Sequence, residues 1–172
     1  GVAGDLDGRM VYYKQSELES SGEYQFAIAM PASNGKIGEQ FVTFNTYQPS
    51  FAVDEQFNNV ENWIQLTNLS SKSVRGTLSF YSQTGKLFKA YTITLGAGVR
   101  RDFSGHQFGQ DVIGLVRWKP EQTDLPVLMR NIRYVYDNPL GLPSYSGAAQ
   151  FEGGVGTGQL ISVPLDTRSG SA

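Results

Sequence analysis

Two stretches of alternating apolar and polar residues flank a short polar segment between positions 61 and 82. Successive side chains of a β-strand point to opposite faces, so the alternation predicts two strands joined as a β-hairpin. In the first strand Ile64 and Leu66 share one face, whereas Trp63 falls on the opposite one. The pattern therefore places one large aromatic residue away from the face of its apolar neighbours.

Strand patterns continue along the rest of the chain. Residues 74–81 and 87–95 alternate in the same way, and Gln83-Thr84-Gly85 between them forms a turn whose glycine suits a positive φ. Residues 112–118 are apolar on both faces, which predicts a central strand covered from both sides. Residues 127–136 are β-branched and aromatic, which predicts a further strand.

Helical patterns are nearly absent. The one candidate, residues 14–20, is short and lacks an apolar stripe. Several short strands separated by turns predict an all-β fold, an antiparallel two-sheet β-sandwich of immunoglobulin-like or jelly-roll-like type with little or no helix.

The chain contains an internal resemblance between residues 9–44 and 130–163. It allows a single β-sandwich domain over residues 1–172, in which two similar hairpins occupy equivalent places. It also allows a tandem array, in which residues 1–50 are the tail of one repeat and 51–172 the complete next one. The single domain is favoured, because residues 9–50 hold few apolar positions for a core of their own. The matching residues at an offset of 121 are Arg9 and Arg130, Tyr13 and Tyr134, Tyr24 and Tyr145, and Ala27 and Ala148, followed after a two-residue slip by Gly35 and Gly154, and Gln40 and Gln159.

Composition narrows the class of protein. The 172 residues include no cysteine, so disulfides and thiolate metal sites are excluded. Fourteen basic and sixteen acidic residues nearly balance, which gives no electrostatic case for nucleic acid or an anionic membrane. Only 17% of residues are charged, which is typical of extracellular β-proteins, and no apolar run is long enough for membrane insertion as a helix.

Without an initial Met or a signal-peptide core, the chain reads as a mature or excised fragment. Asn68-Leu69-Ser70 matches a glycosylation sequon.

One continuous region resembles a known type of module. The runs WIQLTNLSSKSVRGTLSFYSQTGK and YTITLGAGVRRDFS cover about residues 60–104. They resemble bacterial secreted immunoglobulin-like and fibronectin-like β-sandwich modules, in which strands alternate with an Asn-containing polar turn and Gly-containing turns. The resemblance implies an extracellular sandwich used for display, adhesion or assembly, and it implies no catalytic residues. Without cysteine, the chain lacks the Cys–Trp–Cys core of antibody-type domains.

The only histidine suggests a catalytic triad at first sight. His106 lies near Ser104, Asp102 and Asp111 in sequence. A triad requires these groups to converge in space beside an oxyanion hole, and a run of this composition is typical of a polar loop between strands. We therefore expect no catalytic residues and no enzyme activity.

Three further motifs resemble metal, phosphate or catalytic sites in part. Asp5 and Asp7 resemble the start of a calcium loop, but the EF-hand pattern fails at its later positions, so they are weak calcium candidates and no cofactor is expected. The glycine-rich run at 153–158 lacks the Gly-Lys-Ser/Thr ending of a phosphate loop and reads as a turn. The acidic residues Asp54, Glu55 and Glu61 read as exposed loop positions, because a glycosidase needs two carboxyl groups facing each other across a cleft.

The aromatic residues remain as candidate ligand-binding positions. Trp63, Arg75 and Tyr81 share the outward parity of two strands expected to be adjacent, so they could form a flat platform for a sugar face. Alternatively, Trp63 packs beneath another layer, such as the 9–44 segment, or forms a protein–protein surface. Trp118 ends the doubly apolar strand and is a core or rim position, included as a further candidate.

These observations predict a non-enzymatic extracellular or cell-surface module with a structural or adhesion role. The tandem-array alternative would make it a repeating unit of a fibre or matrix protein. Its expected partners are further copies, neighbouring modules or a glycan, without nucleic acid. The alternative is a carbohydrate-binding module of a secreted protein.

Overall fold

The computed structural model describes residues 9–15, 24–47, 60–136 and 145–155. Within them the chain forms strands and one short 3₁₀ helix, η1 (Gly105–Phe108), and none of their helices is long and apolar enough to span a membrane. The strands are β1 (Arg9–Gln15), β2 (Tyr24–Pro31), β3 (Gln40–Asn45), β4 (Val60–Asn68), β5 (Val74–Ser82), β6 (Leu87–Leu95), β7 (Arg100–Ser104), β8 (Ile113–Pro120), β9 (Val127–Tyr136), β10 (Tyr145–Glu152) and β11 (Gly154–Val155).

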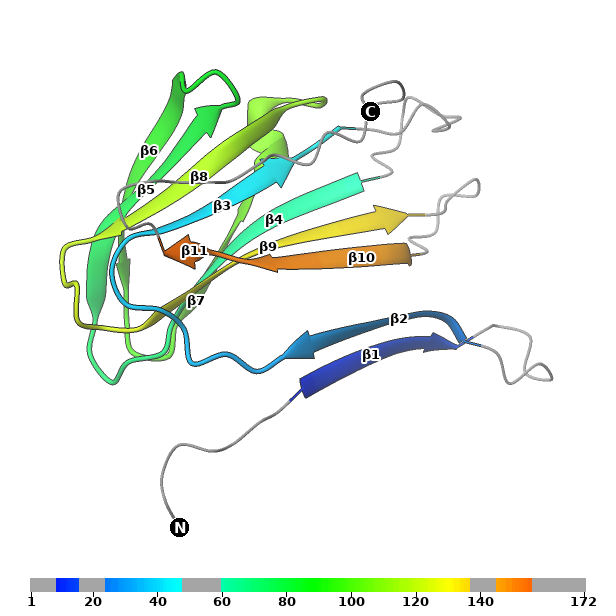
Figure 1. The fold of residues 1–172 in the computed structure, drawn as a ribbon, viewed down its shortest axis with the longest axis horizontal. Coiled ribbons are helices and arrows are strands. Elements are labelled where there is room, and N and C mark those ends of the chain that lie inside the picture. Colours follow the sequence, from blue (N-terminus) through cyan, green and yellow to red (C-terminus); the bar gives the residue numbers. More distant parts are fainter. Residues whose placement is uncertain (1–8, 16–23, 48–59, 137–144, 156–172) are drawn as a thin grey trace, which may run out of the picture.

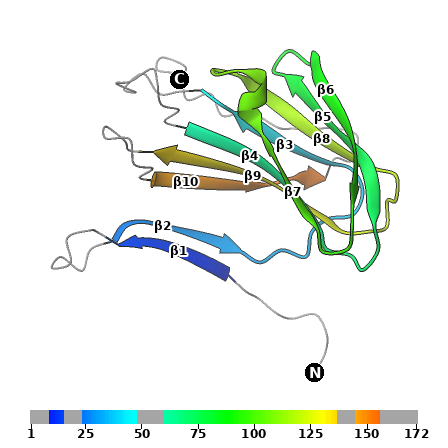
Figure 2. The ribbon, with the colours of Figure 1, turned by 180° about the vertical axis from the view of Figure 1, so that it is seen from behind.

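Two antiparallel sheets pack face to face, which confirms the predicted all-β sandwich (Figures 1 and 2). One sheet has the strand order β10-β9-β4-β7, and the other has the order β11-β3-β8-β5-β6. The hairpin β1–β2 forms a separate two-stranded sheet that lies beside β10.

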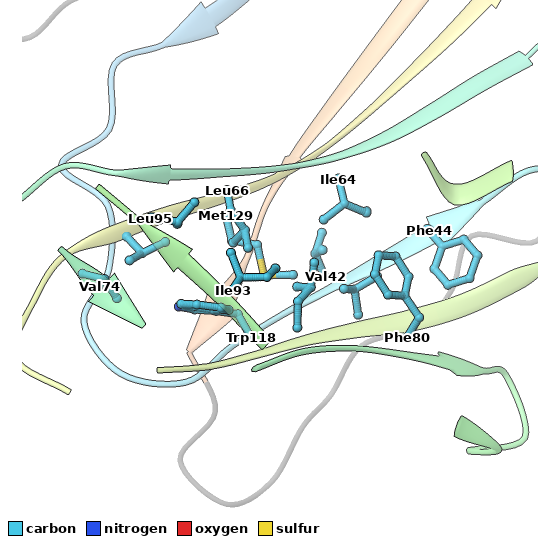
Figure 3. Packing of buried hydrophobic residues seen from close by; sticks show 13 residues of the cluster. Val42, Phe44, Ile64, Leu66, Val74, Phe80, Ile93, Leu95, Trp118 and Met129 are labelled. Atoms are coloured by element: carbon cyan, nitrogen blue, oxygen red, sulfur yellow. The ribbon is translucent and has the colours of Figure 1, made fainter. Parts of the chain in front are cut away.

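The core lies between the two sheets (Figure 3). Alternation along the strands explains it, since every second residue of β4 is buried and the residues between them are half-buried. Phe44 and Phe80 meet edge to face at 5.9 Å between ring centroids, a favourable arrangement for aromatic pairs. The buried cluster comprises Val42, Phe44, Ile64, Leu66, Val74, Leu78, Phe80, Ile93, Leu95, Val116, Trp118, Val127 and Met129.

Several elements agree with the sequence pattern. Strands β5, β6 and β9 form where predicted, and Gly85 between β5 and β6 has the expected positive φ of 82°. Strand β8 is central, between β3 and β5, as predicted. Only one of its faces is fully buried, however, because Leu115 and Arg117 are half-buried and Lys119 is exposed. At Gly114 a Cβ atom would lie 2.2 Å from the carbonyl oxygen of Tyr81, so this close approach of β8 to β5 requires glycine.

The predicted hairpin at positions 61–82 is wrong. Strands β4 and β5 belong to different sheets, so the segment between them crosses from one sheet to the other. The buried Asn68 side chain holds this crossing, because its amide donates to the carbonyl oxygens of Lys72, Leu95 and Gly96 at 2.7, 3.1 and 2.9 Å. Its oxygen accepts from the backbone N–H of Ser70. The sequon asparagine is therefore a buried structural residue in this fold.

The predicted polar loop around His106 is also wrong. Its first part is strand β7, which pairs with β4, and its second part is η1. The Ser104 hydroxyl accepts from the backbone N–H of His106 at 3.2 Å and so caps the short helix.

Candidate functional site

The structure separates the residues of the predicted aromatic platform. Trp63 lies on β4 in the four-stranded sheet, whereas Arg75 and Tyr81 lie on β5 in the five-stranded sheet. The prediction that the three residues share one face of adjacent strands is therefore wrong. The physical reason is the crossing at Asn68, which sends β5 to the opposite sheet.

Each of these residues has a distinct environment. Trp63 is half-buried on the face of β4 opposite Ile64 and Leu66, as the alternation predicted, and its indole N–H donates to Glu61 Oε2 at 2.9 Å. Arg75 forms an exposed ion pair with Glu121 at 3.2 Å, a type of contact that adds little stability. A layer of residues 9–44 over Trp63 stays a prediction.

Trp118 is fully buried in the sandwich core. Its side chain lies beside Gly76 of β5, where a Cβ atom would come within 2.6 Å of the indole. Trp118 is therefore a core residue, and the suggestion that it binds a ligand at the surface is wrong.

The group around His106 has no triad geometry. The Ser104 hydroxyl bonds the backbone of His106 rather than its ring, and Asp102 is paired with Arg100 at 2.7 Å. Both ring nitrogens of His106 are buried. Burial lowers the pKa of His106, and the nearby Glu61 carboxylate partly opposes this shift.

The half-buried His106, whose ring nitrogens are out of contact with water, predicts a pH dependence of folding stability. The unfolded chain binds the proton with the ordinary pKa of 6.5, whereas the folded chain binds it only at lower pH. Unfolding therefore takes up a proton as the pH falls below 6.5, and stability decreases in that range. We expect a lower urea midpoint at about pH 5.5 than at about pH 7.5, with a smaller difference in His106→Phe. An equal pH dependence in both proteins would contradict this assignment.

The remaining motifs give no metal or phosphate site in the described part of the chain. No group of three or more His, Asp or Glu residues converges there. Asp5, Asp7, Asp54 and Glu55 lie outside the described residues. Of the glycine-rich run, Gly153 donates its N–H to Met129 O at 2.8 Å, and β11 pairs with β3, so these residues serve as sheet structure.

A hollow of about 220 Å³ lies at the end of the β5–β6 hairpin, between Gln83, Phe88 and Asp111. Asp111 is the only ionisable side chain among the residues that line it. The hollow thus lacks the second ionisable group that acid–base catalysis commonly uses.

The clearest candidate for a functional feature is the relation between the two hairpins. The offset of 121 residues that aligns Arg9 with Arg130 also aligns the strand pairing of β1–β2 with that of β9–β10. All seven residue pairs of the first hairpin have their counterpart in the second, and the same offset relates their single irregularities. Examples are Arg9–Pro31 with Arg130–Glu152, Tyr13–Ala27 with Tyr134–Ala148, and Gln15–Tyr24 with Tyr136–Tyr145.

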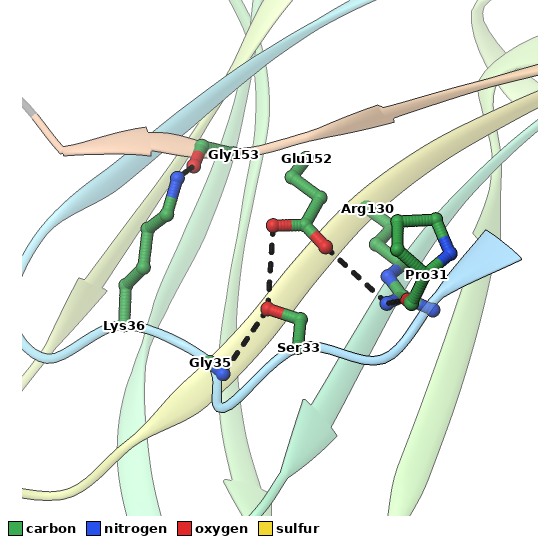
Figure 4. Close-up of polar contacts among 7 residues, drawn as sticks. All are labelled: Pro31, Ser33, Gly35, Lys36, Arg130, Glu152 and Gly153. Carbon is green, nitrogen blue, oxygen red and sulfur yellow. Dashed lines mark hydrogen bonds and ion pairs between the residues drawn. The ribbon is translucent and has the colours of Figure 1, made fainter. Parts of the chain in front are cut away.

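Polar contacts join the end of β2 to the end of the β9–β10 hairpin (Figure 4). The Arg130 guanidinium donates to Pro31 O at 2.9 Å and is paired with Glu152 at 3.3 Å. The Ser33 hydroxyl donates to Glu152, and the Lys36 ammonium donates to Gly153 O at 2.5 Å. We call this group the hairpin junction: Pro31, Ser33, Lys36, Arg130, Glu152 and Gly153.

The junction continues into the core through the segment before β3. The backbones of Lys36 and Val127 form a β-bridge, with both N–H···O contacts at 2.9 and 3.0 Å. The buried Gln40 amide donates to the carbonyl oxygens of the same two residues. The chain between β2 and β3 is therefore fixed against β9 at several points.

Comparisons with known proteins show no family for this chain. No protein-family model matches the chain, and no curated protein does. The fold is similar to the crystal structure of Thermotoga maritima 1070, with 13% identity and a TM-score of 0.48 over 70% of this chain and 95% of that chain. It is less similar to the Anabaena sensory rhodopsin transducer, with 10% identity and a TM-score of 0.38 over 56% of this chain and 97% of that chain. Similarities this weak are no basis for assigning a function.

Proposed function

We propose that the chain is a non-enzymatic structural or adhesion module of the cell surface or extracellular space, and a repeating unit of a fibre or matrix protein. The observation that supports this most is the pair of hairpins with one strand register. In a repeat protein the same structural unit recurs along the chain. The hairpin β1–β2, which precedes the sandwich and matches its β9–β10 hairpin, is therefore expected if such modules follow one another. The low share of charged residues is consistent with an extracellular setting.

The strand order supports the narrower proposal of an immunoglobulin-like or fibronectin-like module. In that fold strands B and E are neighbours in one sheet, and strands C and F are neighbours in the other. Here β4 and β7 are neighbours in one sheet, and β5 and β8 in the other. The outer strands differ, because β9 lies beside β4 and β3 beside β8, which reverses the usual places of the first and last strands.

The proposed mechanism of assembly is strand pairing at a sheet edge. Within the described residues β1 pairs with β2 alone, so its other edge is unpaired with any described strand. An unpaired strand edge is a template for pairing with another chain.

Assembly predicts a mass that depends on concentration. In size-exclusion chromatography with light scattering, we expect the intact chain to form dimers or larger species as its concentration rises. Val11→Pro removes an N–H group from β1 and should weaken this association. The matched variant Val155→Pro changes an exposed residue of the two-residue strand β11 and should leave the association between chains unchanged.

A monomer at every concentration would contradict assembly by this chain. Equal association of both proline variants would exclude β1 as the edge involved.

Carbohydrate binding receives less support from the geometry. A glycan platform would have to be built around Trp63 alone, since Arg75 and Tyr81 lie in the other sheet.

A further inference from the structure

The environments of the two matched hairpins differ at one edge. Strand β9 lies between β10 and β4, so both of its edges are paired. Strand β1 occupies the corresponding place in the first hairpin, and among the described strands it pairs only with β2. The edge of β1 that has no partner among the described strands is the one that corresponds to the edge of β9 on β4.

We propose that β1–β2 completes a second sandwich of the same fold but of different sequence, which we call the second copy, with β1 paired antiparallel to its β4-type strand in the register that β9 uses. This inference rests on the proposed function in taking the chain as a repeating unit. The pairing of β4 with β9 fixes the expected register through the offset of 121 residues. Position 61 of the second copy would face Tyr13, position 62 Tyr12, position 63 Val11, position 64 Met10 and position 65 Arg9.

The sequence of β1 also specifies the chemistry of that strand. In this sandwich Asn62 and Asn131 bond each other in the core, with their amide groups donating at 2.9 and 3.0 Å. The residue of β1 that corresponds to Asn131 is Met10, which cannot accept or donate in the same way. A buried amide without its partner is destabilising, so we expect an apolar residue in the second copy at the position of Asn62.

The hairpin junction would determine where the second copy sits. Strand β2 ends at Pro31, whose carbonyl oxygen accepts from Arg130. The β1–β2 hairpin, which would complete the second copy, is therefore held against the β9–β10 hairpin of the sandwich described above. The Ser33 and Lys36 contacts fix the chain that leads from this hairpin into β3. Successive copies would thus meet along their edge hairpins.

A hairpin exchange within the full-length chain tests this inference. Residues 130–152 are replaced by the equally long segment 9–31, so that β1 takes the place of β9 on β4. We expect the transplanted strand to be protected in hydrogen exchange, with amides at least about tenfold slower than those of β1 in its original place. We also expect Asn62→Val to raise the unfolding midpoint of the exchanged chain, where Met10 takes the place of its amide partner Asn131, and to lower that of the parent chain. Two results would overturn the inference. One is a folded exchanged chain in which the amides of the transplanted β1 exchange freely. The other is an equal fall of the unfolding midpoint caused by Asn62→Val in the exchanged and the parent chain.

A second design covers the case in which the exchanged chain does not fold. A copy of residues 32–129 that carries Asn62→Val is placed directly before Arg9 of the full chain, so that Arg9 follows position 129 as Arg130 does. We expect the amides of β1 to become about as slow as those of β9. In the control, one serine inserted before Arg9 shifts the register and turns every side chain to the other face, which should abolish the protection. Equal protection with and without the insertion, or none in either, would overturn the inference.

Both designs place the two parts in one chain and are measured at low concentration. Their outcome is therefore independent of whether separate chains associate, which tests the proposed function. A monomeric parent chain with a protected β1 in the grafted chain would contradict assembly by the single chain and leave this inference standing.

Discussion

Replacing Trp118 with alanine is expected to lower the free energy of unfolding by about 3–5 kcal/mol. Trp118 is fully buried on the central strand β8, within the cluster that joins the two sheets. Its removal would leave a large cavity, and the backbones of β8 and β5 limit how far the core can collapse into it. Urea unfolding followed by circular dichroism measures the loss.

Trp118→Phe is the matched variant for this prediction. The indole Nε1 of Trp118 is buried without a hydrogen-bond partner among the described residues. Phenylalanine fills much of the same volume and removes this unpaired donor, so its loss should be clearly smaller than that of alanine. A loss below about 1 kcal/mol for Trp118→Ala would contradict the core position.

The face of each strand could be predicted from the sequence because it depends on neighbouring residues. In β5, Val74, Leu78 and Phe80 alternate with polar positions, and all three are buried. In β6 the same rule identifies Ile93 and Leu95. Local alternation therefore predicted β5 and β6, their inward faces and the all-β class, whereas β7, which lacks such a pattern, was predicted as a loop.

The assignment of strands to sheets depends on distant contacts that local alternation does not contain. The crossing between β4 and β5 is held by Asn68 through carbonyl oxygens as far away as Leu95 and Gly96. A polar run between two alternating stretches is equally compatible with a hairpin and a crossing. This ambiguity caused both the wrong hairpin and the wrong aromatic platform of Trp63, Arg75 and Tyr81.

The match between the β1–β2 and β9–β10 hairpins could be predicted only in part from the sequence. Arg9, Tyr13 and their counterparts at an offset of 121 indicated a duplication, but sequence identity says nothing about strand pairing. The register, the matching irregularity and the unequal partners of β1 and β9 required coordinates. The Asn62–Asn131 pair was missed because amides at inward positions on separate strands carry no local signal.

The other large loss of stability is expected at this buried amide pair. Asn131 donates to Asn62 Oδ1 and to the carbonyl oxygen of Thr43, and it accepts from the Asn62 amide at 2.9 Å. Asn131→Val would leave the Asn62 amide and the Thr43 carbonyl without these bonds. Each buried group left unpaired costs about 1–3 kcal/mol, so the variant should be several kcal/mol less stable in urea unfolding.

A double-mutant cycle separates the pair from the simple loss of two polar side chains. Replacing both partners with apolar residues removes the unpaired amides, so Asn62→Val combined with Asn131→Val should cost less than the sum of the single variants. The Thr43 carbonyl stays without its Asn131 bond in the double variant, so the recovery should be incomplete. Strictly additive losses would show that the two amides do not stabilise each other. That result would also remove the basis for expecting an apolar residue at position 62 of the second copy, because this expectation was derived from the Asn62–Asn131 pair.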